Sequence, residues 1–241
     1  ILAQGLTEKW GQSVLVENRP GGSTAIGTVA VERAAPDGHT LLVTSDATFT
    51  ANPHLTSKLT YNPKNLVAIA MLAGITPMLV VNAELPVKNV KEFVEYTKAR
   101  PGKLNYGSYG IGSYSHLSLE DFKQRTGTDI AHVPFGGASP AMVALLRGDI
   151  SVLLLNLASI EAQESEGKLR IIASAGTARA PSRPEFPTVA ESGVPGFMTA
   201  AWFALFGPAG MSADLVAKIN ADAGAALGSK AAKDLFSKQS L

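Results

Sequence analysis

Short runs of small and hydroxylated residues follow most strand-like segments of this 241-residue chain. They occupy residues 44–47, 107–113, 134–137, 156 and 175–176. In open α/β sheets, ligands bind beyond the carboxyl ends of the strands, where loops lead into helix N-termini. These runs carry no lysine, arginine or histidine, and their backbone N–H groups and hydroxyls suit a small anion such as a carboxylate. Each run alone is also explained as a tight turn, but several of one character favour a binding cleft.

Residue types assign roles within this candidate site. We expect hydroxyls and loop amides to donate to the carboxylate, an aromatic ring and a glycine to line the wall, and an asparagine to bind the distal end of the ligand. The candidate ligand-binding residues are Ser45, Ala47, Ser108, Gly110, Gly112, Ser113, Phe135, Gly136 and Asn156. We expect Ser113→Ala to weaken binding by roughly 1–2 kcal/mol, the scale of one charge-assisted hydrogen bond.

Two loop motifs resemble those of enzymes and fail on particular residues. Residues 110–115 read GIGSYS, but Ser115 replaces the third small residue of a dinucleotide fingerprint and the later acidic residue is lacking, which argues against NAD. Residues 137–141 read GASPA, close to a hydrolase elbow. Pro140 has no N–H for an oxyanion hole, so Ser139 reads better as a helix cap. A serine hydrolase or esterase using Ser139 or Ser108 is the alternative function, although we expect no histidine–acid pair beside either serine.

Metal and cofactor chemistry has little support in the sequence. The chain has no cysteine, and its four histidines, at positions 39, 54, 116 and 132, share no i, i+4 spacing. We therefore predict no metal site, no cofactor and no catalytic residue. We expect the backbone to satisfy His116, just inside a helix, and Arg19 to pair with an acid across a domain boundary.

Short β-branched runs alternate with helical patterns along the chain, which predicts parallel sheets covered by helices on both faces. The expected strands are 13–17, 40–44, 66–72, 78–81, 104–106, 130–133, 150–155, 169–174 and 202–206. The expected helices are 1–10, 23–35, 89–100, 114–126, 140–147, 159–166, 187–193, 213–227 and 230–238. The expected strands are too many for a single sheet. We predict two lobes, 1–77 with 197–241 and 78–196, linked by crossover strands at 78–81 and 202–206.

Composition limits the possible partners. Hydrophobic residues make up 46% and charged residues 17%, and the net charge is +1, so no electrostatic footprint for nucleic acid is present. No apolar run approaches the ~18–20 residues that span a bilayer, so we expect no membrane insertion. Both ends of the chain cut into helical patterns, and we expect residues before and after it, the first lobe being the truncated one.

Several sequence blocks resemble a known family. The blocks are VENRPG at 16–21, AAPDGHTLL at 34–42, PGKLNY at 101–106, HVPF at 132–135, GKLR at 167–170 and FPTVAESG at 186–193. In this order and spacing they are similar to the Bug receptors, the periplasmic substrate-binding proteins of tripartite tricarboxylate transporters.

The resemblance implies a two-lobe, Venus-flytrap α/β binding protein, each lobe a doubly wound, mostly parallel sheet. It also implies a monomer in the periplasm that closes on a small carboxylate and serves membrane permease subunits or a sensor kinase. Family members begin with a strand and a Pro/Gly-rich loop ahead of the helix at 1–10. Two departures concern the ligand: Leu155 replaces a usual aspartate, which disfavours an ammonium group, and residues 134–137 read PFGG in place of a Pro-Tyr-Lys-Gly turn.

Overall fold

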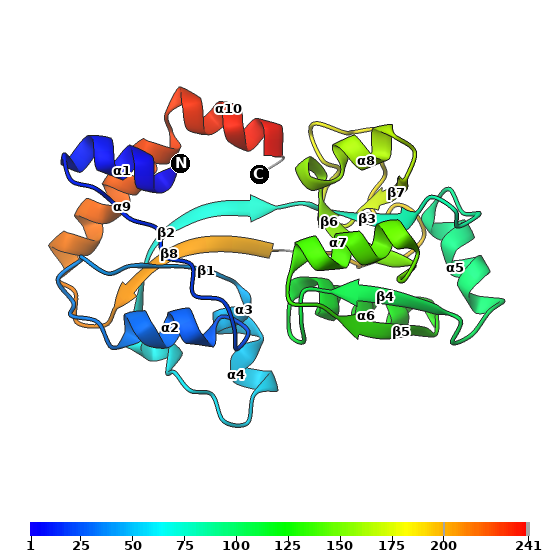
Figure 1. Cartoon of the computed structure of the whole chain (residues 1–241), viewed down its shortest axis with the longest axis horizontal. Helices are drawn as coiled ribbons and strands as arrows, with labels where there is room; N and C mark the ends of the chain where they lie inside the picture. The colour runs from blue at the N-terminus through cyan, green and yellow to red at the C-terminus, as the bar shows by residue number, and fades with distance from the viewer. Residues whose placement is uncertain (200, 240–241) are drawn as a thin grey trace. The chain divides into compact units, whose positions relative to one another are not determined.

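The computed structural model describes residues 1–199 and 201–239, which fold into two compact units (Figure 1). Unit 1 consists of Ile1–Gly74 and Trp202–Ser237, and unit 2 is built from Ile75–Ala201. The sequence placed these boundaries at 77/78 and 196/197. Among the described residues, no helix is long and apolar enough to cross a membrane.

Unit 1 is a small sheet with helices on both faces. Its helices are α1 (Leu2–Trp10), α2 (Ala25–Glu32), α3 (Ala47–Thr50), α4 (Asn52–Leu55), η1 (Pro63–Asn65), α9 (Ala213–Leu227) and α10 (Lys230–Gln239). Its strands β1 (Leu42–Ser45), β2 (Leu66–Ile75) and β8 (Ala201–Pro208) lie in the order β1-β8-β2. β1 and β8 are antiparallel, so the prediction of a mostly parallel sheet is wrong for this pair.

Close contact between α1 and α9 closes one side of unit 1. A Cβ added to Gly5 would lie 2.7 Å from the Cβ of Ala226, so only glycine allows this approach. The Trp10 indole donates to the buried carboxylate of Asp222 at 2.7 Å, and Lys218 pairs with the same carboxylate at 2.7 Å. These bonds lower the pKa of Asp222 to about 2.

Unit 2 holds the larger sheet, in the order β5-β4-β6-β3-β7. Its strands are β3 (Pro77–Asn82), β4 (Leu104–Ser108), β5 (Ile130–Pro134), β6 (Val152–Asn156) and β7 (Leu169–Ser174). Its helices are α5 (Val90–Lys98), α6 (Tyr114–Thr126), α7 (Ala138–Arg147), η2 (Leu157–Ser159) and α8 (Glu161–Ser165). β4 is parallel to β5 and β6, whereas β3 is antiparallel to β6 and β7, so the sheet is mixed.

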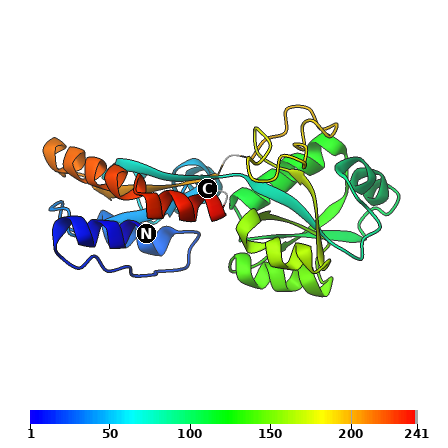
Figure 2. The same ribbon diagram turned by 90° about the horizontal axis from the view of Figure 1, so that it is seen from above.

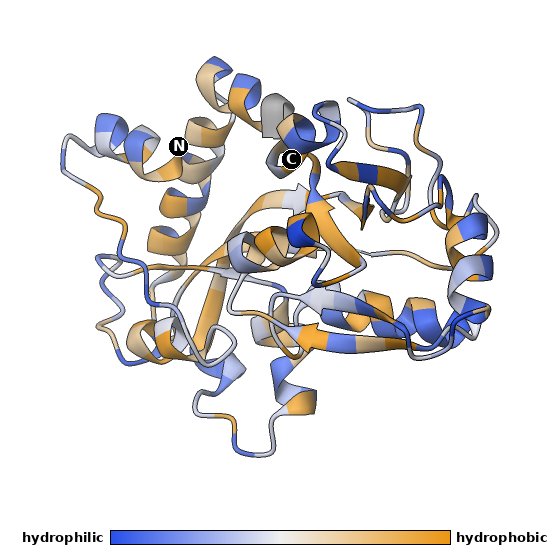
Figure 3. Ribbon diagram, turned by 45° about the vertical axis from the view of Figure 1, so that its right-hand side comes forward, coloured by the Kyte–Doolittle hydropathy of each residue, from blue (hydrophilic) through white to orange (hydrophobic). Residues whose placement is uncertain are grey.

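The central strands of unit 2 are buried on both faces (Figure 2). Leu79, Val81 and Leu154 face α5 and α6, whereas their neighbours Met78 and Val80 face α7. This arrangement requires continuous apolar runs, since successive side chains point to opposite faces. Figure 3 shows these strands in hydrophobic colours beside helices that carry both kinds of residue.

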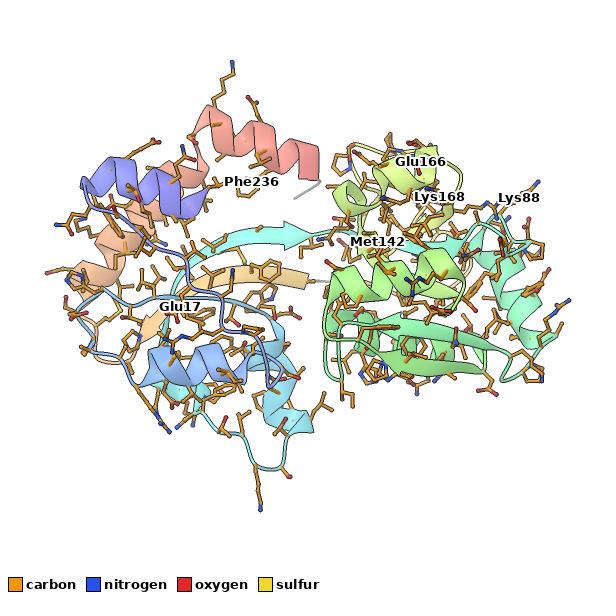
Figure 4. All side chains as sticks on the ribbon, viewed as in Figure 1. Glu17, Lys88, Met142, Glu166, Lys168 and Phe236 are labelled. Atoms are coloured by element: carbon orange, nitrogen blue, oxygen red, sulfur yellow. The ribbon has the colours of Figure 1, made fainter. Side chains whose placement is uncertain are left out.

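An exposed charge pair joins the two sides of the turn between α8 and β7. Glu166 and Lys168 flank the turn from α8 into β7, and their side chains meet at 2.6 Å (Figure 4). Met142, on α7, is partly buried and packs against the apolar core between α7 and the sheet (Figure 4).

Three sequence predictions for elements are wrong. Residues 13–17 form no strand and pair with no strand of the described residues, and Leu15 is 88% exposed. Residues 187–193 form turns: Thr188 and Glu191 exchange the hydrogen bonds of a capping box, but the chain turns at Gly193, where φ is +101°. Residues 78–81 and 202–206 are not crossovers, because 78–81 lie within unit 2 and 202–206 lie within unit 1.

Candidate functional site

The carboxyl ends of β4, β5 and β6 meet on one side of unit 2, which we call the carboxyl edge. The parallel pairing of these strands places Ser108, Pro134 and Asn156 there. The antiparallel β3 begins at the same edge, with Pro77 opposite Asn156. The loops that follow these strands therefore lie together, as the position rule for open α/β sheets requires of a ligand site.

The loop 108–113 closes on itself through its own hydroxyls. Ser113 Oγ donates to Gly110 O at 2.7 Å and lies 3.0 Å from Ser115 Oγ. Ser115 Oγ also accepts from the Tyr109 amide, and Ser108 Oγ accepts from the Gly110 amide at 3.2 Å. Gly110 and Gly112 have φ of +113° and +84°, which side chains with a Cβ rarely adopt. The loop is held by its own hydrogen bonds, and most of its donors are used within it.

Two histidines support this loop from neighbouring elements. His132, on β5, lies with Nε2 2.6 Å from Ser108 Oγ. His116, on α6, accepts from the Gly112 amide at Nδ1, at 3.3 Å. Burial lowers the pKa of both rings. The expectation that the backbone satisfies His116 is confirmed.

His132 lies beside the candidate nucleophile Ser108, but no carboxylate in the described residues is hydrogen-bonded to His132, so the expected absence of a histidine–acid pair is not contradicted. Ser108 is fully buried, however, and its Oγ is enclosed by the loop that it supports. A catalytic nucleophile must be accessible to its substrate. Because Ser108 is buried, its contact with His132 has a structural role, which is to support the loop. Ser139 is exposed, and no histidine in the described residues bonds to it.

Free donors lie instead at the start of α7. This helix has ten residues, and its N-cap Gly137 supplies no side-chain oxygen. The amides of residues 136–139 donate to no described residue, and Gly136, Ala138 and Ser139 are exposed. The first amides of a helix have no partner within it and carry its positive dipole end. An anion at this point gains several N–H donors without a basic side chain.

Both buried, unpartnered side-chain atoms of the described residues lie at the carboxyl edge. One is Asn156 Oδ1, at the end of β6. The other is Thr199 Oγ1, whose backbone N–H donates to Ala175 O just beyond β7. Buried polar atoms are almost always paired in native proteins, and exceptions mark functional places or bound water.

Unit 1 has its own candidate loops after β1. Ser45 is half-buried, Ala47 is buried at the start of α3, and burial raises the pKa of Asp46 between them. Before α2, Ser23 and Thr24 have φ of +51° and +79°. Backbone strain of this kind is often found at functional sites.

Thr24 is the N-cap residue of α2, but its side chain makes no capping hydrogen bond. Its Oγ1 lies 2.7 Å from Thr48 Oγ1, inside a hydroxyl cluster, and no side chain caps the helix. Arg19 pairs with Glu17 at 2.9 Å within the same exposed segment, so the expected pairing across a domain boundary is wrong.

Comparison with known protein families identifies the family of this chain. A model for the "Tripartite tricarboxylate transporter family receptor" matches residues 1–241. The chain is a member of this receptor family. Among curated relatives, BugT of Bordetella pertussis is 34% identical over 241 residues, covering 99% of this chain and 74% of its own length. A second protein of the same species is 33% identical over 208 residues, covering 86% of this chain and 64% of its own length.

Solved structures of other receptors are closely similar. Rpa4515 of R. palustris, solved with adipate, has a TM-score of 0.94 and 31% identity, covering 99% of this chain and 80% of its own. MatC from Rhodopseudomonas palustris, with bound malate, has a TM-score of 0.89 and 31% identity, covering 99% and 82%. The periplasmic binding protein BugD has a TM-score of 0.89 and 28% identity, covering 99% and 80%. These matches confirm the two-lobe fold and the family that the sequence blocks indicated.

The structure brings most predicted site residues of this receptor to one edge. Loop 108–113 contains four of them, Phe135 joins it through a hydrogen bond from its amide to Ser108 O at 2.9 Å, and Gly136 and Asn156 lie on neighbouring loops. Ser45 and Ala47 belong to unit 1. Residue types did not reveal the amides of 136–139, because a free N–H has no sequence signature. They also did not reveal the pairing of His116 with His132, which only the packing of α6 on β5 creates.

Proposed function

We propose that this chain is part of a receptor for a small organic acid, which binds at the carboxyl edge of unit 2. The observation that carries the proposal is the set of unpartnered amides at residues 136–139. The loops 108–113, 134–139 and 156–159 contain no lysine or arginine, so the carboxylate is held by dipoles and hydroxyls. The relatives solved with adipate and malate support an acidic ligand of this size.

Each loop has a separate task in this proposal. The amides of 136–139 hold the carboxylate, and loop 108–113 forms the wall beside them. Phe135 and Gly136 line the surface, and Asn156 meets the distal end of the ligand. We also propose Ser45, at the end of β1, and Ala47, at the start of α3, both in unit 1, as ligand-binding residues. Because Leu155 is fully packed in the core and offers no charge, a ligand with an ammonium group is disfavoured.

The cellular role follows from the family. We place the receptor in the periplasm as a monomer that delivers its ligand to membrane permease subunits or presents it to a sensor kinase. Proteins named as periplasmic among the similar structures support this location. The chain spans 64–74% of the two relatives described above, and the partners of the whole protein are part of the proposal.

A thermal-shift screen tests the ligand class. The protein is heated with malate, adipate and succinate, with their neutral diamides, and with simple sugars. An acid at a hundredfold excess over Kd stabilises the folded state by about 2.7 kcal/mol. We expect shifts with acids only. A clear shift with sugars or diamides and none with any acid would overturn the proposal.

The serine hydrolase alternative rests on the Ser108–His132 contact and has its own assay. We expect no turnover of 4-nitrophenyl acetate above the rate without protein. Turnover that Ser108→Ala or Ser139→Ala abolishes would favour the enzyme instead.

A further inference from the structure

A stack of three rings lies behind loop 108–113. The ring centroids of His116 and His132 are 4.3 Å apart, with 35° between their planes. The ring of Tyr106 stacks on His132 at 4.8 Å and 20°. The members come from α6, β5 and β4, so the stack ties these elements together beneath the loop. We call His116 and His132 the histidine pair.

Each member of the histidine pair touches a different end of the loop. His132 Nε2 bonds to Ser108 Oγ at 2.6 Å, at the start of the loop. His116 Nδ1 accepts from the Gly112 amide, near its end. Acceptance at Nδ1 requires that this nitrogen carries no proton, because a charged imidazole is a donor at both nitrogens. Protonation of His116 would therefore place two N–H groups against each other.

The charged groups around the pair act in opposite directions, because the charge of Glu120 raises the pKa of both rings and the charge of Lys123 lowers it. Glu120, on α6, is the nearby carboxylate, and it already accepts from Lys123 Nζ at 2.8 Å and from the hydroxyl of Tyr106. Lys123 lies 5.6 Å above the Tyr106 ring and brings its own positive charge. Burial is the main cause that lowers the pKa of each histidine, and His116 lowers that of His132 further.

We infer that His116 and His132 are positioning residues that hold loop 108–113 in its ligand-receiving form, and that this form persists only while His116 is neutral, so that acid weakens ligand binding. This inference rests on the proposed function, since the loop is the wall of the proposed carboxylate site. The weakening begins below about pH 6.5, the ordinary pKa of histidine, because the folded pKa values lie lower still. The readout is the affinity at the carboxyl edge, which neither ring needs to touch.

Matched variants isolate the effect. In the double variant His116→Asn with His132→Gln, amide groups replace the ring nitrogens that face Gly112 and Ser108. Neither of the two side chains then titrates. Malate binding is measured by calorimetry at about pH 7.5 and about pH 5.5 for the wild type, this variant and His39→Asn, whose histidine is exposed in unit 1. Protonation of malate itself affects all three proteins equally.

We expect affinity to fall on acidification about fivefold more in the wild type and in His39→Asn than in the double variant, the factor of one neutral hydrogen bond. An equal fall in all three overturns the inference and leaves the proposed function standing. Tighter binding by the wild type at the lower pH also overturns it, because attraction between imidazolium and carboxylate would then dominate.

A measurement without ligand decides the inference if no acid binds or the double variant fails to fold. The amide resonance of Gly112 in the wild-type protein is followed by NMR from about pH 8 to about pH 5. A titration with its midpoint below about 6.5 supports the inference. A resonance that does not move overturns it. Absence of binding by every acid, in contrast, counts against the proposed function.

Discussion

Ala138 holds the first helical position of α7, where proline can replace it without loss of a hydrogen bond inside the helix. Its N–H is one of the free amides at the carboxyl edge, and its side chain is exposed. Proline is favoured at this position of helices, and the preceding Gly137 lies outside the helical region that proline forbids to its neighbour. Ala138→Pro therefore removes one donor from the proposed site and little else.

The magnitude follows from the chemistry of that donor. A hydrogen bond to a charged group contributes roughly 1.5–3 kcal/mol, which corresponds to a roughly 10- to 150-fold rise in Kd. Calorimetric titration with malate or adipate, whichever binds, measures the change. The melting temperature of the unliganded variant should stay within a few degrees of the wild type, because α7 keeps all its internal bonds.

Two controls complete the experiment. Ala213→Pro makes the same substitution at the first position of α9 in unit 1, where Ser212 caps the helix, and it should leave Kd unchanged. Ser139→Ala removes a hydroxyl but keeps the amide. An unchanged Kd in Ala138→Pro, with both controls normal, would refute the role assigned to the start of α7.

Three further predictions concern stability. Ser113→Ala removes the cap of α6 and should lower the free energy of unfolding by about 1 kcal/mol in urea denaturation, whereas an unchanged midpoint would contradict the capping role. The pKa of Asp222 is about 2 in the folded state against about 3.9 unfolded, so its contribution is present above pH 3.9 and is lost as pH falls toward 2. Asp222→Asn should flatten this part of the stability curve, and an unaltered acid profile would argue against the lowered pKa that the hydrogen bonds from Lys218 and Trp10 produce. Gly5→Val should cost roughly 1–3 kcal/mol because its Cβ meets Ala226, and a melting temperature equal to that of the wild type would show that α1 moves aside freely.

The sequence predicted the central strands of the fold because strands that are buried on both faces consist almost entirely of apolar residues. Val152–Asn156 and Pro77–Asn82 are nearly continuous apolar runs, as strands covered on both faces must be. Residues 13–17 carry the same apolar signal without forming a strand, because a strand needs a neighbour that local sequence does not specify. The sequence also did not predict the direction of each strand. β3 is antiparallel to both of its neighbours although its composition is similar to theirs.

The sequence predicted which loops follow the strands of unit 2, but not which of their donors are left without a partner. Glycine and hydroxyl residues predicted a tight loop at 108–113, since tight turns require them. The hydroxyls of Ser108 and Ser113 then bond to the nearest loop atoms, which leaves them less free than residue type suggests. The free donors are backbone amides before and within the first turn of α7, and every sequence has those. Their availability depends on Gly137, which caps the helix with no side chain.

Calorimetric titration of an acid and its matched diamide tests the central claim most directly. Malate and malamide, and adipate and adipamide, differ at the groups that the free amides of residues 136–139 are proposed to hold. The account predicts saturable heat for at least one small dicarboxylate and none for its diamide. Saturable binding of a diamide or another neutral solute, with no heat from any acid, would contradict it.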